Sequence, residues 1–292
     1  MSQRVLVLGC GYLGRRVAVA WHRRGDRVHA MTRSLARAES FRRQGLEPVV
    51  GDVTDPASLV DLPTVDVVLF AVGRDRERTS QTMREVSLDG LRHVIDVMQG
   101  RCGRFLFVSS TGVYGQSDGE WVDEESACDP ARENGRVLVE AESEVRDRLG
   151  NRASLLRLAG LYGPDRLISR RDTLRSATPL AGDPRAWLNL IHVDDAAAAV
   201  IACGDRDDRE RTWLACDDRP VRREEFFGKL AELFEAPPPT FDVTRAGSRI
   251  DGIGKRCCNR RLRRDLGLLL EFPSIDEGLP AAVAATPETP QT

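Results

Sequence analysis

A glycine-rich turn near the start of the chain is the first segment whose residue types and spacing can do chemistry. It reads GCGYLG over residues 9–14, directly after an apolar run and directly before a helical pattern. Glycines at these three positions permit a tight turn, let a backbone approach a pyrophosphate, and let the helix pack on the strand. We therefore predict a dinucleotide-binding loop, the alternative being a turn that needs glycine only for its shape. The predicted contacts are Gly9, Gly11, Tyr12, Leu13 and Gly14.

The end of the second apolar run bears on which dinucleotide would bind. NAD sites usually place an acidic residue about 20 residues beyond the glycines, where it binds the ribose 2′-hydroxyl. Here residues 31–34 read MTRS, without a carboxylate. The planar fork of a guanidinium matches the oxygens of a 2′-phosphate. Arg33, aided by Arg37, therefore predicts NADP in preference to NAD, the alternative being a solvated arginine in an arginine-rich chain.

Small residues and one carboxylate follow the third and fourth apolar runs. Residues 51–53 read GDV and residues 71–73 read AVG. Both segments stand at the carboxyl ends of predicted strands, where an open α/β sheet binds its ligand. A carboxylate there can accept the adenine amino group, although a plain loop acid is the alternative. The predicted cofactor contacts are Asp52, Val53, Ala71, Val72 and Gly73.

The elements that must position these residues alternate between short apolar runs and longer amphipathic segments. We expect strands at 5–9, 27–31, 46–50, 65–70, 104–110 and 154–160, and helices at 13–24, 35–44, 81–98 and 136–149. Strands that are apolar throughout suit a sheet buried on both faces, and repeated strand–helix–strand units make that sheet parallel. The pattern predicts an α/β fold with a Rossmann-type doubly wound parallel sheet.

The alternation of apolar runs and amphipathic segments becomes irregular after Gly163-Pro164. We expect an NAD(P)-binding domain over 1–164, completed by about 189–216, a smaller α/β lobe on the substrate side over 165–280, and a disordered tail over 281–292. Residues 165–188 are polar and without a clear period, and the tail is rich in Pro, Ala and Thr. Helices are expected at 194–203, 222–235 and 259–268, with a strand at 212–216.

Composition sets limits on the class of protein. The chain has 292 residues, a formal net charge of −2 and 41% hydrophobic residues, which fit an ordinary globular protein. We expect neither a nucleic acid nor a membrane as partner, and a cytoplasmic location. The seven cysteines have no metal-ligand spacing, so we expect reduced thiols and no metal. Lysine and tyrosine are scarce: the chain has only Lys229, Lys255, Tyr12, Tyr114 and Tyr162.

Taken together, the motifs resemble those of the extended short-chain dehydrogenase/reductase superfamily, in its NAD-dependent epimerase/dehydratase family. The resemblance covers nearly all of residues 4–280, and the pattern is most like the atypical, YeeZ-like bacterial branch. It rests on GCGYLG (9–14), GDVTD (51–55), FVSSTGVYG (107–115), LLRLAGLYGP (155–164), LNLIHVDDAAAAV (188–200), RPVRREEFFGKLAELF (219–234) and CNRRLRRDLGL (258–268).

The resemblance implies roles for several residues. The family carries a catalytic hydroxyl four residues before the tyrosine of VYG, which is Ser110 here, with Tyr114 as the tyrosine of that motif. The LYGP turn, with Leu161 and Tyr162, would contact the nicotinamide carboxamide. The substrate would be a small molecule with a carbonyl or alcohol, or a nucleotide sugar. A homo-oligomer stays open, as do the substrate and the direction of the reaction.

One expected feature of that family is missing from the sequence. Its acid/base is a tyrosine in a Tyr-x-x-x-Lys pair on the helix after VYG, but residues 131–150 contain neither tyrosine nor lysine. Aligning the helix glutamate of the family with Glu142 places Asn134 and Leu138 at the two positions. Aligning it with Glu140 places Arg132 and Arg136 there instead.

Three interpretations follow from the missing pair. The protein could be an oxidoreductase or epimerase whose proton moves through Tyr114, or otherwise through water or Glu133. It could be an inactive NADP(H)-binding redox sensor or regulatory protein. It could also bind a substrate and use the nucleotide only as structure. We favour the first, because Ser110, Tyr114 and the LYGP turn are retained. We expect His192 to be structural, docking the helix that follows it.

Overall fold

The protein divides into two compact units in a computed structural model that describes residues 2–73, 81–206, 211–245 and 252–286. The first unit comprises Met1–Tyr114, Cys128–Arg157 and Ala197–Trp213, and the second comprises Gly115–Ala127, Leu158–Ala196 and Leu214–Thr292. The second unit therefore includes a segment, 115–127, that the sequence pattern did not set apart from the first domain.

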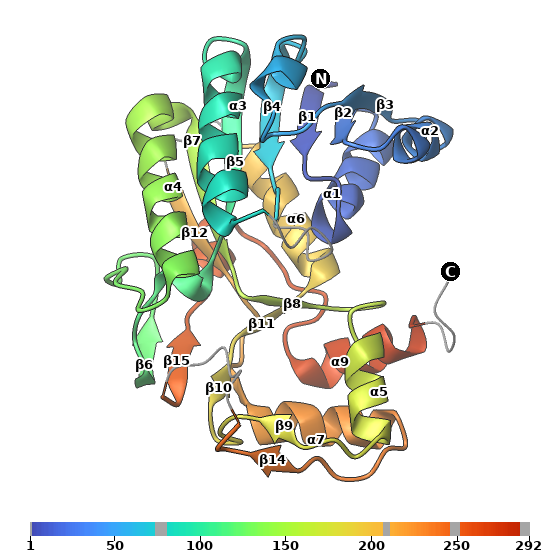
Figure 1. The fold of residues 1–292 in the computed structure, drawn as a ribbon, viewed down its shortest axis with the longest axis vertical. Helices are drawn as coiled ribbons and strands as arrows, with labels where there is room; N and C mark the ends of the chain where they lie inside the picture. Colours follow the sequence, from blue (N-terminus) through green and yellow to red (C-terminus); the bar gives the residue numbers. More distant parts are fainter. Residues whose placement is uncertain (1, 74–80, 207–210, 246–251, 287–292) are drawn as a thin grey trace. The chain divides into compact units, whose positions relative to one another are not determined.

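A seven-stranded sheet, in the order β12-β7-β5-β4-β1-β2-β3, is the main architectural feature (Figure 1). The pairs β1–β2, β1–β4, β2–β3 and β4–β5 are parallel. Because β1 lies between β2 and β4, the strand order reverses direction at the end of β1. The expected Rossmann-type doubly wound fold is confirmed. The strands are β1 Arg4–Leu8, β2 Arg27–Thr32, β3 Glu47–Val50, β4 Val65–Phe70, β5 Cys102–Ser110, β7 Ala153–Leu158 and β12 Arg211–Ala215.

Helices follow most of these strands, as the alternation in the sequence predicts. Helices α3 and α4 lie side by side in Figure 1. The helix expected over 81–98 contains a π-helical turn, η2 (Glu85–Asp89), before α3 begins. The helices associated with the sheet are α1 Tyr12–Arg23, α2 Leu35–Arg43, α3 Gly90–Met98, α4 Glu133–Leu149 and α6 Val193–Gly204, with short turns η1 Pro56–Leu59, η3 Thr111–Val113 and η4 Gly150–Arg152.

The core of the first unit explains why its strands are apolar throughout. Residues 5–8 of β1 are fully buried, and the aromatic rings of β4 and β5 pack against one another. Phe70 lies 6.5 Å from Phe105 and 5.9 Å from Phe107, measured between ring centroids. Trp21 of α1 is also fully buried. The sheet is thus covered on both faces, as continuous apolar runs require.

The second unit is built from short elements around its own apolar core. Four two-stranded pairs form it: β6 Asp118–Val122 with β15 Gly254–Cys257, β8 Gly160–Tyr162 with β11 Leu190–His192, β9 Leu180–Ala181 with β14 Phe241–Asp242, and β10 Trp187–Leu188 with β13 Val221–Arg222. Its helices are α5 Ile168–Arg175, α7 Arg223–Leu233, α8 Arg260–Asp265 and α9 Ile275–Ala284. Phe226, Leu230, Ile275 and Leu279 belong to its core.

Two expectations for this unit differ from the structure. Helix α5 forms inside the segment 165–188 that lacked a sequence period, because Leu167 and Leu174 are buried in the core. Helix α9 runs through Ala284, so residues 281–284 are helical although we expected a disordered tail, since Leu279 and Ala282 pack into the same core. The end of the expected tail, 287–292, lies outside the described residues.

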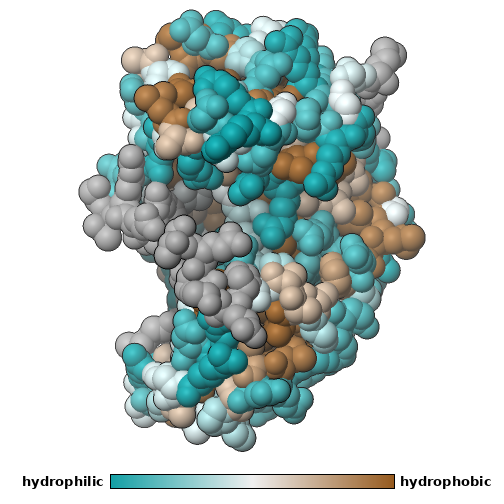
Figure 2. Space-filling view, turned by 90° about the vertical axis from the view of Figure 1, so that its right-hand side faces the viewer, coloured by the Kyte–Doolittle hydropathy of each residue, from teal (hydrophilic) through white to brown (hydrophobic). Residues whose placement is uncertain are grey.

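The surface in Figure 2 is mostly hydrophilic, with apolar residues in smaller patches. Exposed apolar side chains such as Leu35 and Leu269 are ordinary for a globular chain. None of the described helices combines the length and the apolar composition that crossing a membrane requires.

Candidate functional site

The glycine loop joins β1 to α1 by close backbone contacts that only glycine permits. Gly9 has a φ of +93°, and a Cβ there would lie 2.5 Å from the backbone of Ala71. A Cβ on Gly14 would lie 2.3 Å from the carbonyl oxygen of Gly9. Gly11 differs, because a Cβ there would meet no protein atom within 4 Å. Two glycines therefore serve the fold, whereas Gly11 leaves open space beside the helix N-terminus.

A cavity of about 490 Å³ opens beside this loop. It lies at the carboxyl ends of β1 to β4, at the reversal of strand order where open α/β sheets bind ligands. Most of the predicted cofactor residues line it, namely Gly9, Gly11, Arg33, Asp52, Val53, Ala71, Val72 and Gly73. The lining also includes residues that we did not single out, namely Cys10, Met31, Thr32, Ser34, Gly51, Gln81 and Val86, together with Arg37.

Three of the predicted loop contacts, Gly14, Tyr12 and Leu13, are not part of that lining. Tyr12 is half-buried, and the Arg16 guanidinium lies 4.3 Å from its ring centroid. The Leu13 side chain is buried. The side chains of Tyr12 and Leu13 therefore serve the surface and the core, and only the backbone amides of these residues, at the start of α1, are placed as an anion-binding helix terminus would require.

Two arginines meet the cavity at the end of β2. Arg33 Nη1 lies 3.9 Å from Asp52 Oδ2, and Arg37 Nη2 donates to the Cys10 carbonyl oxygen at 2.8 Å. Ser34 caps α2 by accepting from the Arg37 backbone N–H. Asp52 Oδ1 also accepts from the Thr54 backbone and hydroxyl at 3.0 and 2.8 Å. The cavity thus has guanidinium groups at its β2 side and one carboxylate that is already engaged by its own turn.

The predicted catalytic residues lie outside that cavity lining. Ser110 Oγ accepts from the Gly112 backbone N–H at 3.1 Å and caps η3, which is the capping role that hydroxyls often take at a strand end. Tyr114 is 3% exposed, and Arg157 Nη1 donates to its phenol oxygen at 3.0 Å. The structure therefore places Ser110 and Tyr114 on one short segment, with Tyr114 buried.

Helix α4 occupies the place where the sequence lacks the tyrosine and lysine of the family pattern. Asn134 is exposed and Leu138 is buried, so the first alignment puts an apolar side chain at the lysine position. In the second alignment, Arg136 is exposed and donates to Glu133 and to the Ala131 carbonyl oxygen at 3.2 and 2.8 Å. Neither arrangement offers a side chain that readily gives up a proton.

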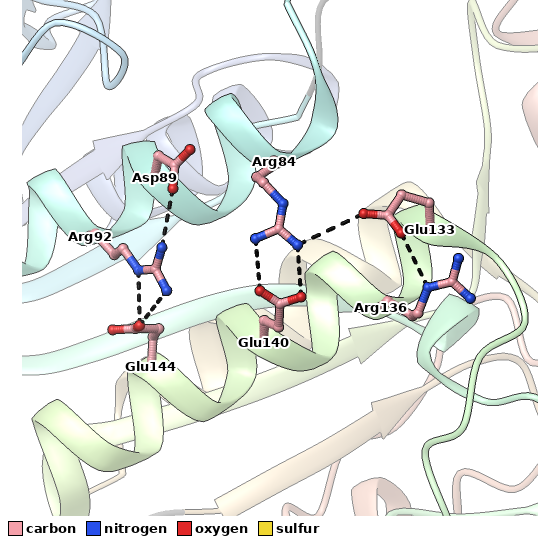
Figure 3. Close-up of polar contacts among 7 residues, drawn as sticks. All are labelled: Arg84, Asp89, Arg92, Glu133, Arg136, Glu140 and Glu144. Carbon is pink, nitrogen blue, oxygen red and sulfur yellow. Dashed lines mark hydrogen bonds and ion pairs between the residues drawn. The ribbon is translucent and has the colours of Figure 1, made fainter.

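Ion pairs join α4 to Arg84, the residue before η2, and to α3 along their exposed sides (Figure 3). Arg84 donates to both oxygens of Glu140 at 2.8 Å, and Arg92 donates to Glu144 at 2.7 Å. The other members of this surface ladder are Asp89, Glu133 and Arg136. Such exposed pairs contribute little to the stability of the fold, about 0–1 kcal/mol each.

Tyr162 of the LYGP turn lies in the second unit, where its side chain is part of the core. Its phenol donates to the Ser274 carbonyl oxygen at 3.3 Å, and burial raises its pKa above the ordinary value. His192 packs between the rings of Tyr162 and Phe272, at centroid distances of 5.3 and 4.0 Å. His192 thus has a packing role here. Leu161 is half-buried, and the cofactor contact predicted for this turn remains a prediction for its backbone.

Two buried carboxyl groups lie near Tyr162. Asp195 accepts from the backbone N–H groups of Glu271 and Phe272 at 2.8 and 2.9 Å. Burial, and then the charge of Asp195, raise the pKa of Asp217 to about 8, although the Tyr162 phenol and the His192 backbone offset part of the rise. Among the described residues, no donor makes a well-formed hydrogen bond to either oxygen of Asp217. Asp217 is therefore protonated at neutral pH.

No three His, Cys, Asp or Glu side chains gather within the described part of the chain in a way that could hold a metal ion. What the first unit offers is a glycine-lined cavity, a helix N-terminus and two guanidinium groups. A dinucleotide fits this set, because its pyrophosphate needs close backbone approach and N–H donors.

Comparisons with known proteins agree with this geometry. A model of the NAD dependent epimerase/dehydratase family matches residues 5–214. Protein YeeZ of Escherichia coli is 29% identical over 280 residues, which cover 93% of this chain and 97% of YeeZ.

Two solved structures share the fold. A functionally unknown conserved protein from Silicibacter pomeroyi is 28% identical with a TM-score of 0.81, over 98% of this chain and 99% of its own. UDP-glucose 4-epimerase of Thermotoga maritima, solved with UDP-glucose, is 18% identical with a TM-score of 0.79, over 97% of this chain and 98% of its own.

The open space at Gly11 gives a first prediction. In Gly11→Ala the added methyl group meets no protein atom, so the unfolding midpoint should stay unchanged, while the methyl blocks a pyrophosphate. We expect at least about a tenfold weaker binding of nicotinamide dinucleotide, measured by calorimetry. Gly228→Ala in α7, where a Cβ also meets no atom, is the control and should bind as the wild type does. Unchanged binding in Gly11→Ala would contradict the site.

The buried Asp217 gives a second prediction, on stability. Its folded pKa is raised from 3.8 to about 8, so its contribution to stability is full below about pH 4 and is lost as the pH rises toward 8. Denaturant unfolding should show the wild type losing up to roughly 1.4 kcal/mol per pH unit relative to Asp217→Asn across this window. Exposed Asp118→Asn should follow the wild type. If the free energies of unfolding of the wild type and of Asp217→Asn changed with pH in the same way, the prediction would be refuted.

Proposed function

Because the chain belongs to the NAD dependent epimerase/dehydratase family, we propose that it is an NADP-dependent oxidoreductase or epimerase of the extended short-chain type. Its substrate would be a carbonyl compound, an alcohol or a nucleotide sugar. The observation that carries the proposal is the cavity at the carboxyl ends of β1 to β4, lined by the glycine loop and by Arg33 and Arg37.

The cofactor would be held by backbone at one end and by guanidinium groups at the other. The amides that begin α1 would bind the pyrophosphate beside Gly11, and Ala71 to Gly73 would lie along the adenosine ribose. The bound nicotinamide would supply hydride transfer, so the protein has to supply orientation and a partner for the proton.

The preference for NADP rests on charge at the end of β2. The lining contains two guanidinium groups there, and the one nearby carboxylate, Asp52, already accepts from Thr54. A 2′-phosphate would bind beside Arg33 and Arg37 in the bidentate way that suits arginine. A ribose 2′-hydroxyl would instead need a carboxylate acceptor, and the end of β2 carries none.

For the proton, we propose the segment that carries Ser110 and Tyr114. The Ser110 hydroxyl would hydrogen-bond the substrate oxygen, and the Tyr114 phenol would exchange the proton. Glu133 is a weaker candidate, because its carboxylate is engaged by Arg84 and Arg136 on the surface of α4 (Figure 3).

A second candidate function is supported by the burial of Tyr114. Since Tyr114 is only 3% exposed and α4 carries neither tyrosine nor lysine, the protein could bind NADP(H) without turning over a substrate. It would then act as a redox sensor or regulatory protein that reports the state of the cofactor to a partner.

Selectivity for the 2′-phosphate is a third prediction. Arg33→Ala should weaken NADPH binding by about tenfold or more and leave NADH binding nearly unchanged, because only the phosphate meets the guanidinium. Exposed Arg43→Ala on α2 is the matched control and should change neither. Equal weakening of both dinucleotides in Arg33→Ala would remove the argument for NADP.

A turnover test separates the enzyme from the sensor and is a fourth prediction. We expect either oxidation of NADPH with at least one carbonyl substrate or epimerisation of at least one nucleotide sugar without net change of the cofactor, with a rate that falls at least about a hundredfold in Ser110→Ala. NADPH should still bind to that variant. Tight NADPH binding without turnover of any substrate, together with a change of conformation on oxidation of the cofactor, would favour the sensor.

A further inference from the structure

The phenol of Tyr114 belongs to a buried network of four side chains, with Arg157, Glu142 and Ser109 as the other members. Arg157 of β7 donates from Nη1 to the phenol oxygen at 3.0 Å, and its guanidinium carbon lies 5.1 Å from the ring centroid. The same guanidinium donates from Nε and Nη2 to both oxygens of Glu142 at 3.0 and 2.7 Å. Ser109 of β5 donates to Glu142 at 2.7 Å. Tyr114, Arg157 and Glu142 are 3%, 4% and 1% exposed.

The charges of this network leave the phenol beside a net positive group. Glu142 is shared by two cations, because Arg146 also donates to it at 3.0 Å. Burial disfavours the Glu142 carboxylate, but Arg157, Ser109 and Arg146 hold its pKa below the ordinary value. Burial likewise disfavours the Arg157 cation, but Glu142 and then Tyr114 raise its pKa above the ordinary value. Both groups are therefore ionised.

The geometry fixes Arg157 in place, because two of its nitrogens are committed to Glu142 and a third points at the phenol oxygen. A positive charge next to a phenol stabilises the phenolate over the neutral form. The Cys128 thiol also interacts electrostatically with Arg157, Glu142 and Arg146, and burial raises its pKa above the ordinary value. The thiol is therefore neutral and adds no charge to the network.

We propose that Arg157, held by Glu142, is the positioning residue for Tyr114 and supplies the cation that no lysine of α4 provides. This inference rests on the proposed function, in which Tyr114 exchanges the proton. In that step the phenol O–H bond breaks, the substrate oxygen takes the proton, and the electron pair stays on the phenolate oxygen that Arg157 Nη1 holds. Water then returns a proton to the phenolate. Arg157 itself keeps its protons throughout.

The test follows the ionisation of Tyr114 directly, without substrate or cofactor. The chain has only three tyrosines, so subtracting the ultraviolet pH titration of Tyr114→Phe from that of the wild type isolates Tyr114. Because Arg157→Gln alone would strand the buried Glu142 charge, the main variant is Arg157→Gln with Glu142→Gln, which removes both charges and keeps amides in their place.

The proposal expects the tyrosinate signal of Tyr114 to move up by about one pH unit or more in the double variant. Arg157→Lys keeps a positive charge at this position, so the pH at which its Tyr114 ionises should lie close to that of the wild type. Arg152→Gln, a change on an arginine near the start of β7 that bonds the Cys102 carbonyl oxygen, should leave it in place. An unshifted signal in the double variant, or a wild-type Tyr114 that ionises only on unfolding, would overturn the proposal.

The same variants separate this inference from the proposed function. If Arg157 controls the titration but no substrate turns over, the pairing of Arg157 with Tyr114 stands and the enzymatic function fails. If turnover is found and Arg157→Lys keeps it while the charge-free double variant loses it, both stand. Turnover that survives in the double variant would show that the proton takes another route.

Discussion

The contact between the first βα turn and the end of β4 is the constraint on which the site depends. Gly9 brings its backbone so close to Ala71 that no side chain fits between them, and Gly14 does the same to Gly9. These contacts draw the start of α1 down onto the sheet at the reversal of strand order. The helix N-terminus, the small residues after β4 and the arginines after β2 thereby line one cavity.

The sequence was sufficient for the sheet and for most of this cavity, because the signals there are local. Apolar runs without alternation predict buried parallel strands, and a glycine at 9, 11 and 14 predicts the turn between two of them. Residues that follow parallel strands then meet at one edge, whatever their separation in the chain. For this reason Arg33, Asp52 and Gly73 could be assigned to one site without coordinates.

The rest depends on contacts between distant residues, which a local pattern does not contain. Two-residue strands such as β9 and β10 exist only because partners far along the chain pair with them, and α5 and α9 form against a shared core. The burial of Tyr114 was not predicted either. The sequence did contain a signal for it. Arg157 lies inside an apolar strand and Glu142 lies on an otherwise apolar helix face, and buried charges of opposite sign are usually paired with one another.

The two sides of α4 respond differently to ionic strength. The ion pairs of Arg84 and Arg92 with Glu140 and Glu144 are open to solvent, so dissolved ions screen their attraction. The Debye length, which sets the range of unscreened attraction, is about 8 Å in physiological salt and shorter at higher ionic strength. The Glu142–Arg157 pair is shielded from mobile ions by the protein around it. High salt should therefore weaken the exposed ion pairs between α4 and α3, while the buried Glu142–Arg157 ion pair beside Tyr114 keeps its strength.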